Sequence, residues 1–336
     1  MYMDYEVADV VIVGAGIAGL AAASVLESNG LNVMVLDKGR SVGGRMTTRR
    51  IGPGLADDGA QFFTVRDPVF ESIVNDWLEQ GIIFVWSYGF NDGSLETAPT
   101  DGHPRYAAHG GMGALARHIA SGLRDVRVNT PIATATCDDK GWILQDEDGQ
   151  LYTGNALLMT APVPQSLQIL DEGATLLTRD DYVVLSGIEY APSLTGIFWV
   201  QGTVTLPFPG AIQRREANIF WISNNHEKGI SPDALVVTVQ ASDDYSIQMW
   251  SAPDARILSA LRTDLEIFMR DGTTVREAQL KRWRYSRPTK PLEERVFVAD
   301  NDPPLLFAGD AFGGPRVEGA VLSGMAAAEH LISIAR

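Results

Sequence analysis

Three glycines and one aspartate near the start of the chain have the spacing of a nucleotide-binding turn. An apolar run at residues 10–13 leads into Gly14, Gly16 and Gly19, and a second apolar run ends at Asp37. The first glycine permits a tight turn from strand to helix, the second lets a pyrophosphate approach the backbone, and the third lets the helix pack closely on its strand. A carboxylate at the end of the second strand accepts hydrogen bonds from an adenosine ribose. The spacing therefore predicts a βαβ unit that binds a dinucleotide.

The segment after this unit departs from the regular βα repeats of a nicotinamide-dependent enzyme. It continues with Gly43, Gly44, Arg45 and Met46. A glycine pair lets the backbone wrap a pyrophosphate, and the arginine would neutralise the phosphate or brace the flavin side of the site. The alternative is a surface turn with a solvated arginine.

A second glycine-rich motif lies near the C-terminus, where the apolar run at residues 304–308 ends in Gly309 and Asp310. We expect Asp310 to hold a ribityl hydroxyl, or alternatively to act as a helix N-cap. A helix of small residues follows, from near Gly319 to about Ile334. Its N-terminus would stabilise the negative charge that develops on a flavin ring during reduction. Two such motifs in one chain favour FAD, bound noncovalently because no histidine or cysteine occurs at residues 300–324.

These motifs together resemble those of the renalase-type flavoproteins, within the wider amine oxidase and hydroxybenzoate hydroxylase-like superfamily. The segments that carry the resemblance are the first βαβ unit and residues 43–46, 58–64, 110–115, 160–165, 282–288 and 309–324. The resemblance implies an α/β fold in which a Rossmann-like FAD-binding domain is interleaved with a mixed α+β substrate domain built on an antiparallel sheet. The expected FAD-binding domain comprises residues 1–66, 107–164 and 290–336, and the substrate domain residues 67–106 and 165–289.

The resemblance also implies which residues contact the cofactor. They are Gly14, Ala15, Gly16, Ile17, Ala18, Gly19, Asp37, Lys38, Gly44, Arg45, Met46, Ala60, Gln61, Phe62, Ile132, Ala161, Gly309, Asp310, Arg316, Val317, Glu318, Gly319 and Ala320.

The implied activity is that of an FAD-dependent oxidase. It would take a hydride from a small substrate, a dihydro-nicotinamide isomer of NAD(P), and pass the electrons to dioxygen to give hydrogen peroxide. Such a transfer needs no protein base if the product is an aromatic pyridinium. Two alternatives remain open: a flavin amine oxidase, in which aromatic rings orient a small amine, and a flavin-binding or redox-sensing protein without turnover.

Three residues are candidates for positioning the substrate. Gln61 and Phe63 lie in the segment that the resemblance places along the flavin, although Gln61 has the structural alternative of a hydrogen bond to a neighbouring strand. Trp283 lies in a predicted strand whose alternation places it with Tyr285 on one face, where a flat ring could stack. Both aromatic side chains have the alternative of belonging to the core.

Two departures from the renalase pattern fall on the expected substrate side. Gln240 stands where renalases often have histidine, and the turn at residues 225–230 lacks their Pro-Gly-Arg ending. These departures concern the substrate rather than the cofactor.

The elements that position these motifs can be read from hydrophobic periodicity. Strands are predicted at residues 126–128, 133–137, 142–146 and 156–160, of which the last three form a meander. Pro162 and Pro164 cannot continue a central strand, so they predict a crossing between domains. Further strands are predicted at residues 196–201, 217–223, 235–241 and 278–285. Helices are predicted at residues 113–123 and, from apolar residues at helical spacing, 253–269.

Composition limits the class of protein. The 336 residues exceed what one hydrophobic core usually organises, which predicts two domains. The net charge of -15 disfavours nucleic acid and anionic membranes as partners. Cys137 is the single cysteine, which excludes an intrachain disulfide and fits a cytoplasmic protein. The five histidines show no metal-ligand spacing, so we expect no metal. A small-molecule substrate and dioxygen are the expected partners, and the sequence makes no prediction of the oligomeric state.

Overall fold

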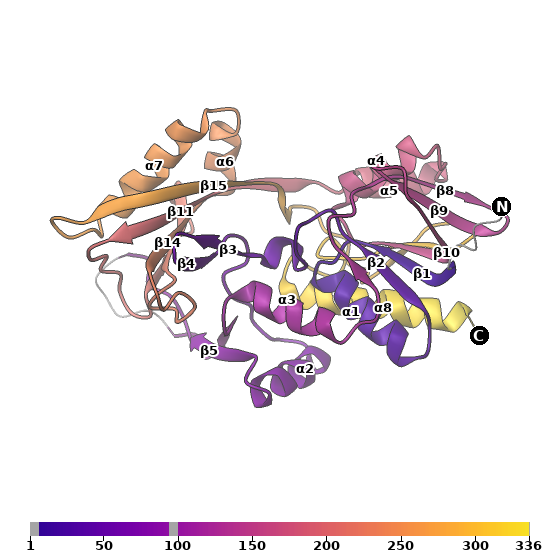
Figure 1. Ribbon diagram of the computed structural model, residues 1–336, viewed down its shortest axis with the longest axis horizontal. Coiled ribbons are helices and arrows are strands. Elements are labelled where there is room, and N and C mark those ends of the chain that lie inside the picture. Colours follow the sequence, from indigo (N-terminus) through magenta and orange to yellow (C-terminus); the bar gives the residue numbers. More distant parts are fainter. Residues whose placement is uncertain (1–6, 94–99, 336) are drawn as a thin grey trace. The chain divides into compact units, whose positions relative to one another are not determined.

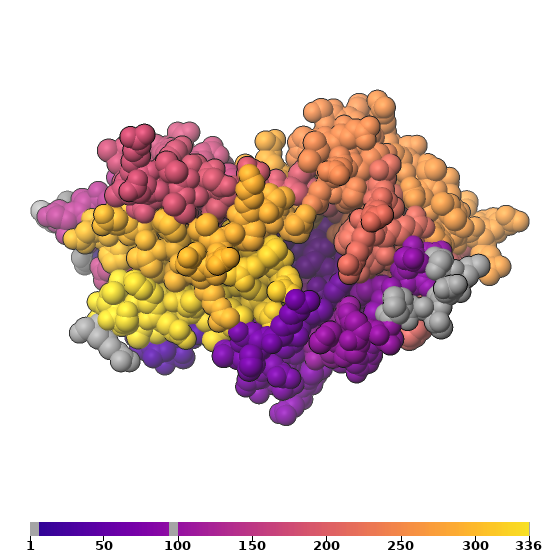
Figure 2. All heavy atoms as spheres, turned by 180° about the vertical axis from the view of Figure 1, so that it is seen from behind, coloured from indigo at the N-terminus to yellow at the C-terminus, as the bar shows by residue number. Residues whose placement is uncertain are grey.

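The computed structural model describes residues 7–93 and 100–335, which form two compact units (Figure 1). One unit comprises Met1–Gly44, Ala116–Glu189 and Pro288–Arg336, and the other comprises Arg45–Leu115 and Tyr190–Arg287. Each unit is therefore assembled from segments that are far apart in the sequence. In the second unit, the purple and orange stretches of chain lie together in the space-filling view (Figure 2).

The boundaries of the two units differ from the boundaries that we predicted. Residues 45–66 and 107–115 group with the second unit, whereas residues 165–189 and 288–289 group with the first. The hairpin formed by β3 (Thr48–Ile51) and β4 (Gly54–Asp57) explains the first difference, because it packs on the sheet of the second unit. Helix α4 (Val163–Glu172) contributes to the second difference, because it packs on a strand of the first unit.

The sheet of the first unit has a parallel core. Its strands run in the order β16-β17-β10-β1-β2-β7. They are β1 (Val7–Val13), β2 (Val33–Leu36), β7 (Val126–Arg127), β10 (Leu151–Met159), β16 (Phe297–Val298) and β17 (Leu305–Phe307). Strand β1 pairs in parallel with β10 and β2, and β17 pairs in parallel with β10. The predicted meander is confirmed as β8 (Ile132–Asp138), β9 (Gly141–Asp146) and β10, which pair antiparallel in sequence order.

Two helices pack together against the parallel strands. They are α1 (Ile17–Ser28) and α8 (Val317–Ile334), which bury a shared apolar core with β1, β2 and β10. Their close contact depends on small residues. A Cβ added at Gly324 would lie 2.1 Å from the carbonyl oxygen of Ala18, so only glycine allows the two backbones to approach this closely.

The predicted crossing between domains at Pro162 and Pro164 is wrong. The chain instead enters α4, with proline in the first helical turn, and then α5 (Arg179–Ser186) within the same unit. Proline is tolerated in the first turn because a backbone N–H there has no partner within the helix.

The second unit is built on a five-stranded sheet with the order β12-β13-β14-β11-β15. Its strands are β11 (Tyr190–Gln201), β12 (Ala211–Gln213), β13 (Ile219–Asn224), β14 (Leu235–Ala241) and β15 (Thr274–Pro288). The four strands predicted here are confirmed, and β15 extends well beyond its predicted ends. Helices α6 (Asp243–Met249) and α7 (Asp254–Glu266) cover one face of the sheet. The opposite face carries the β3–β4 hairpin.

The remaining elements of the second unit precede this sheet in the sequence. A 3-10 turn (Gly44–Met46) begins at its first boundary, and α2 (Pro68–Glu79), β5 (Ile83–Ser87) and β6 (Arg105–Ala108) follow the hairpin. The predicted helix at residues 113–123 is confirmed as α3 (Met112–Ser121). No helix within residues 7–93 and 100–335 is both long enough and apolar enough to cross a membrane.

The contact between α1 and α8 leads to the first prediction. We expect Gly324→Ala to lower the free energy of unfolding by about 1–3 kcal/mol, because the added methyl overpacks the contact with the Ala18 carbonyl. Urea unfolding followed by circular dichroism measures this change. Ser333→Ala, at an exposed position of the same helix, is the matched control and should change stability little. Equal stability of G324A and the parent protein would contradict the packing argument.

Candidate functional site

The glycine turn after β1 forms one end of the site. Gly14 has a φ of 117°, and a Cβ there would lie 2.6 Å from Thr160 Oγ1. A Cβ at Gly19 would lie 2.0 Å from the Gly14 carbonyl oxygen, so the helix packs against its own turn. Gly16, in contrast, faces open space, because an added Cβ would have no neighbour within 4 Å. The turn is thus packed against protein atoms at Gly14 and Gly19 and open to solvent or a ligand at Gly16.

The amides at the start of α1 are suited to bind an anion. Gly16 is the N-cap of α1, and no side chain caps it. The first N–H groups of a helix have no partner within the helix and carry a partial positive charge. Uncapped amides beside an open glycine fit the pyrophosphate of a dinucleotide.

Asp37 braces this turn from the end of β2. Its Oδ2 atom accepts a hydrogen bond from the Ala15 N–H at 2.6 Å, and its Oδ1 atom accepts one from the Gly39 N–H at 2.6 Å. A carboxylate has about four acceptor positions, so each oxygen can still accept a ribose hydroxyl. The predicted role of Asp37 in ribose binding therefore fits its geometry, and the same side chain also fixes the shape of the turn.

The C-terminal motif lies at the same edge of the sheet. Because β1, β10 and β17 are parallel, the chain leaves all three strands at one edge. After β17, Gly309 donates its N–H to Ser323 Oγ at 2.8 Å, and Asp310 follows. Helix α8 begins at Val317, two residues before the predicted start, and no side chain caps its N-cap residue, Arg316. Gly319 lets the preceding loop fold onto the helix, since a Cβ there would lie 2.2 Å from the Gly314 carbonyl oxygen.

The predicted cofactor residues are divided between the two units. Most of those of the first unit follow the carboxyl ends of β1, β2, β10 and β17 or lie at the starts of α1 and α8, whereas Ile132 begins β8. Those of the first unit are residues 14–19, Asp37, Lys38, Gly44, Ile132, Ala161, Gly309, Asp310 and residues 316–320. The others, Arg45, Met46, Ala60, Gln61 and Phe62, belong to the second unit.

In the second unit, residues 57–61 form a loop that we call the motif loop. It begins at the last residue of β4 and lies on the face of the sheet that carries the β3–β4 hairpin. Side chains from the sheet and from the turn after β13 hold its backbone carbonyls. The donors are Thr238 to the Asp57 oxygen at 3.1 Å, Trp283 to Asp58 at 2.7 Å, Gln240 to Gly59 at 2.8 Å, and Lys228 to Gln61 at 2.6 Å. The loop is therefore fixed by hydrogen bonds along its whole length.

A buried ion pair fastens the motif loop. Lys228 Nζ lies 2.6 Å from Asp57 Oδ2, and both side chains have no exposed surface. The other oxygen of Asp57 accepts hydrogen bonds from Thr48 Oγ1 at 2.6 Å and from the Met112 N–H at 2.8 Å. Burial lowers the pKa of Lys228, and the charge and hydrogen bond of Asp57 act in the opposite direction.

The sequence did not identify this ion pair. Lys228 lies in the turn at residues 225–230, which departs from the renalase pattern. This departure was the feature of the sequence that could have drawn attention to Lys228. The other departure, Gln240, donates its amide to the motif loop. Both departures thus lie in segments that hold this loop.

Gln61 makes structural hydrogen bonds, which were the alternative to a contact with substrate. Its amide nitrogen donates to the carbonyls of Asp57 at 2.7 Å and Gly59 at 3.1 Å, and its amide oxygen accepts from Ser223 Oγ at 3.1 Å. The side chain is 5% exposed. Gln61 therefore shapes the motif loop through its own amide.

Phe63 lies in an aromatic core, which argues against the predicted contact with substrate. Its ring is 3% exposed and stacks on Tyr106 at a centroid distance of 5.4 Å. Phe70 and Trp77 of α2 meet the same ring edge-on. Phe63 therefore belongs to the packing of α2 against this segment.

Trp283 and Arg45 connect the motif loop with β15. Trp283 is half-buried, and its indole N–H is fixed by the Asp58 carbonyl. Arg45 Nη1 donates to the carbonyls of Tyr285 at 3.3 Å and Ser286 at 3.2 Å. Arg45 thus braces the strand that carries Trp283, a contact that was not among the roles predicted for it.

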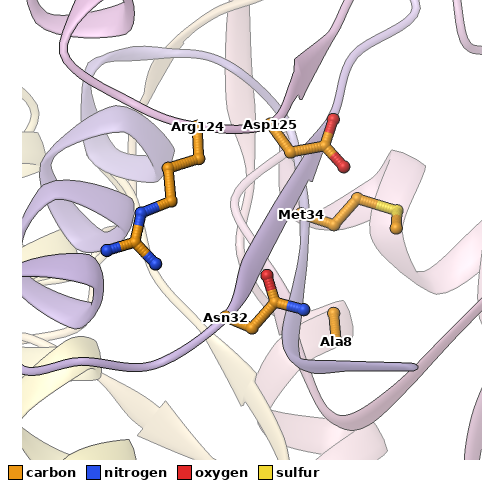
Figure 3. Close-up of a pocket in the computed structure, with 5 residues that line it drawn as sticks. All are labelled: Ala8, Asn32, Met34, Arg124 and Asp125. Atoms are coloured by element: carbon orange, nitrogen blue, oxygen red, sulfur yellow. The ribbon is translucent and has the colours of Figure 1, made fainter. Parts of the chain in front are cut away.

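Two further observations concern other kinds of site. A polar hollow of about 460 Å³ is lined by Ala8, Asn32, Met34, Arg124 and Asp125 (Figure 3). These residues lie at the amino ends of β1, β2 and β7, and so at the edge of the parallel sheet opposite the glycine turn. Within the described part of the chain, no three His, Cys, Asp or Glu side chains are grouped to hold a metal ion.

Comparison with known protein families supports a flavoprotein. The family described as flavin containing amine oxidoreductase matches residues 78–332, and the NAD(P)-binding Rossmann-like domain matches residues 12–77. A protein from Exiguobacterium that is assigned as a protoporphyrinogen oxidase superposes with a TM-score of 0.71 at 15% identity. A putrescine oxidase variant superposes with a TM-score of 0.68 at 17% identity. Each superposition covers 97% of this chain and 99% of the other, and at these identities it shows the fold.

Local sequence similarity extends to several curated flavoenzymes. Squalene epoxidase erg1 of Schizosaccharomyces pombe is 31% identical over 147 residues, which is 44% of this chain and 30% of the epoxidase. Amine oxidase B of Cavia porcellus is 60% identical over 42 residues, which is 12% of this chain and 8% of that enzyme. The chain thus aligns with less than a third of the length of these relatives.

The buried ion pair leads to the second prediction. We expect Lys228→Met to lower the free energy of unfolding by about 3–5 kcal/mol, because it leaves the Asp57 carboxylate buried without its counter-charge. Combining Lys228→Met with Asp57→Asn should recover part of this loss, since the uncompensated charge is then removed. Urea unfolding of both variants measures the coupling. If the two side chains acted independently, the double variant would be less stable than K228M, and the difference would equal the loss caused by D57N alone. That result would contradict the prediction.

Proposed function

We propose that this chain, which belongs to the flavin-containing amine oxidoreductase family, oxidises dihydro-nicotinamide isomers of NAD(P). The chain is an FAD-dependent oxidoreductase, and its cofactor is bound noncovalently. FAD, when bound, supplies a two-electron acceptor that dioxygen can reoxidise with release of hydrogen peroxide. The residues suited to hold its nucleotide portion are those at the glycine turn, Asp37 and the start of α8.

Charge on strand β15 is the observation that supports a dinucleotide substrate. The strand carries five basic residues, Arg276, Lys281, Arg282, Arg284 and Arg287, against a single acidic residue, Glu277, in a chain of net charge -15. Lys281 Nζ lies 4.0 Å from the centroid of the Trp283 ring. A cation beside a half-buried indole favours an anionic ligand with a flat ring over a ligand that carries an ammonium group.

The carboxylates of the motif loop are paired with cations. Asp57 pairs with Lys228, and Asp58 Oδ2 lies 3.2 Å from Arg49 Nε. Burial raises the pKa of Asp58, while its hydrogen bond with Thr47 and the charges of Arg49 and Lys281 lower it. The Asp58 carboxylate therefore lies within the field of two cations, Arg49 and Lys281.

In this proposal the protein orients the substrate and does not act as a base. Trp283 presents a ring whose orientation is fixed by the Asp58 carbonyl. Gln61 and Gln240 use their amides to hold the motif loop, so we assign them positioning roles. Loss of a hydride from a dihydro-nicotinamide yields an aromatic pyridinium directly, and no proton has to be removed from carbon.

Amine oxidation is the second candidate function, and a cluster of aromatic rings supports it. Phe62 lies 5.0 Å from Phe90 and 5.6 Å from Trp221 between ring centroids, and Phe90 meets Trp221 edge-on at 4.8 Å. Aromatic faces attract an organic cation or orient an amine. The family description includes amines as well. Tyr285, another candidate for such a cage, is instead in edge contact with Tyr190.

An anaerobic substrate screen tests the proposed function. We expect dihydro-nicotinamide isomers to bleach the flavin absorbance of the purified yellow protein, and air to restore the colour with release of hydrogen peroxide. Benzylamine and putrescine, at the same concentrations, should leave the absorbance unchanged. Bleaching by amines alone would establish the second candidate function and reject the first. Failure of both substrate classes to bleach the flavin would reject both.

A variant of Lys281 tests the charge argument directly. We expect Lys281→Gln to raise the KM for a dihydro-NADP isomer about fivefold to tenfold while kcat changes less than twofold, because one attractive charge is lost in binding. Steady-state peroxide release measures both constants. Arg276→Gln removes the same charge from an exposed position on the same strand and serves as the control. An equal rise in KM for R276Q would show that only the overall charge of the strand matters.

A further inference from the structure

A second hollow, of about 390 Å³, lies within the second unit, and nothing in the proposed oxidation uses it. Aromatic residues and one carboxylate, from β5, the segment before β12 and the turn after β13, surround it. The residues that matter here are Phe84, Trp86, Phe208, Pro209, Glu227 and Lys228. We propose that this hollow, the aromatic hollow, binds a small organic ammonium ion.

The aromatic walls differ in how firmly they are held. Trp86 is 8% exposed, and its indole N–H donates to the Pro209 carbonyl at 3.2 Å. Phe208, in contrast, is 86% exposed. A rigid indole beside a freely exposed phenyl ring suits a ligand that enters from solvent. Ring faces attract cations, and alkyl groups on the nitrogen add apolar contact.

Glu227 supplies the charge that selects a cation. Its Oε1 atom accepts a hydrogen bond from Asn224 Nδ2 at 2.9 Å. Its Oε2 atom lies against Gly210, where an added Cβ would be only 2.6 Å away. Within the described part of the chain, no Lys, Arg or His nitrogen forms an ion pair with this carboxylate. Burial raises the pKa of Glu227, while its hydrogen bond with Asn224 and the charge of His226 lower it.

The charge of Lys228, the cation that lines this hollow, is already compensated by Asp57. Lys228 has no exposed surface, and its ammonium group binds Asp57 and the Gln61 carbonyl, both at 2.6 Å. The same group lies 4.8 Å from the centroid of the Trp86 ring. His226 turns its Nδ1 atom toward the Ser231 carbonyl at 2.9 Å. Glu227 is therefore the group whose charge a ligand in the aromatic hollow would meet.

Binding of choline to the FAD-loaded protein tests the proposal. Isothermal titration under anaerobic conditions should show saturable binding of choline. Its neutral isostere, 3,3-dimethylbutan-1-ol, should bind about tenfold more weakly, because it keeps the shape and loses the charge. Glu227→Gln should weaken choline binding about tenfold and leave the isostere unaffected. Phe208→Ala should weaken choline binding about threefold. Because Phe208 is exposed, this substitution should leave the fold intact.

Glu216→Gln is the matched control, because it removes one negative charge from an exposed turn of the same sheet. Its choline affinity should equal that of the parent protein. Equal affinities for choline and its isostere would overturn the proposal, as would equal losses in E216Q and E227Q. Choline binding that survives E227Q and perturbs the flavin spectrum would place the ligand elsewhere and also overturn it. These measurements require no turnover, so their outcome is separate from that of the substrate screen.

Discussion

The Asp57–Lys228 ion pair is the contact on which the second unit depends. Removing two charges from water is costly, and the cost is offset only where geometry and hydrogen bonds satisfy both groups. Here the carboxylate accepts from Lys228, Thr48 and the Met112 amide, and the ammonium binds both Asp57 and the Gln61 carbonyl. One pair of side chains therefore ties together β3, β4, the start of α3 and the turn after β13. The motif loop inherits its shape from this pair.

The first unit depends on a different constraint, the closeness of backbones at one edge of a parallel sheet. Thr160 donates to the carbonyls of Val13 and Gly14, and Asp37 accepts from the Ala15 amide. Glycine is required where helix and turn touch, and it leaves open space at Gly16. Parallel strands place the ends of β1, β2 and β17 together, so motifs from both ends of the sequence contribute to one nucleotide-binding edge.

Electrostatics distinguishes the regions of the second unit. Strand β15 concentrates positive charge in an acidic chain, and some of that charge is paired, as Arg282 is with Asp254. The aromatic hollow instead combines ring faces with the carboxylate of Glu227. Lys228 lines the aromatic hollow without exposing its charge, because Asp57 compensates it.

The sequence by itself determined the elements whose signals are local. The glycine spacing and Asp37 predicted the nucleotide-binding turn, and the final glycine-rich motif predicted α8. Alternation predicted β8 and β9, and strand-rich composition predicted β13 and β14. All of these patterns depend on neighbouring residues. Tertiary structure alone decided the Lys228–Asp57 pair, the commitment of Gln61 and Gln240 to the motif loop, and the burial of Phe63. These depend on contacts between residues that are distant in the sequence, up to 181 positions apart for Gln240 and Gly59. The crossing at Pro162 was wrongly predicted for the same reason: proline ends a strand both before a domain crossing and before a helix, and only the packing of α4 on β8 decided between them.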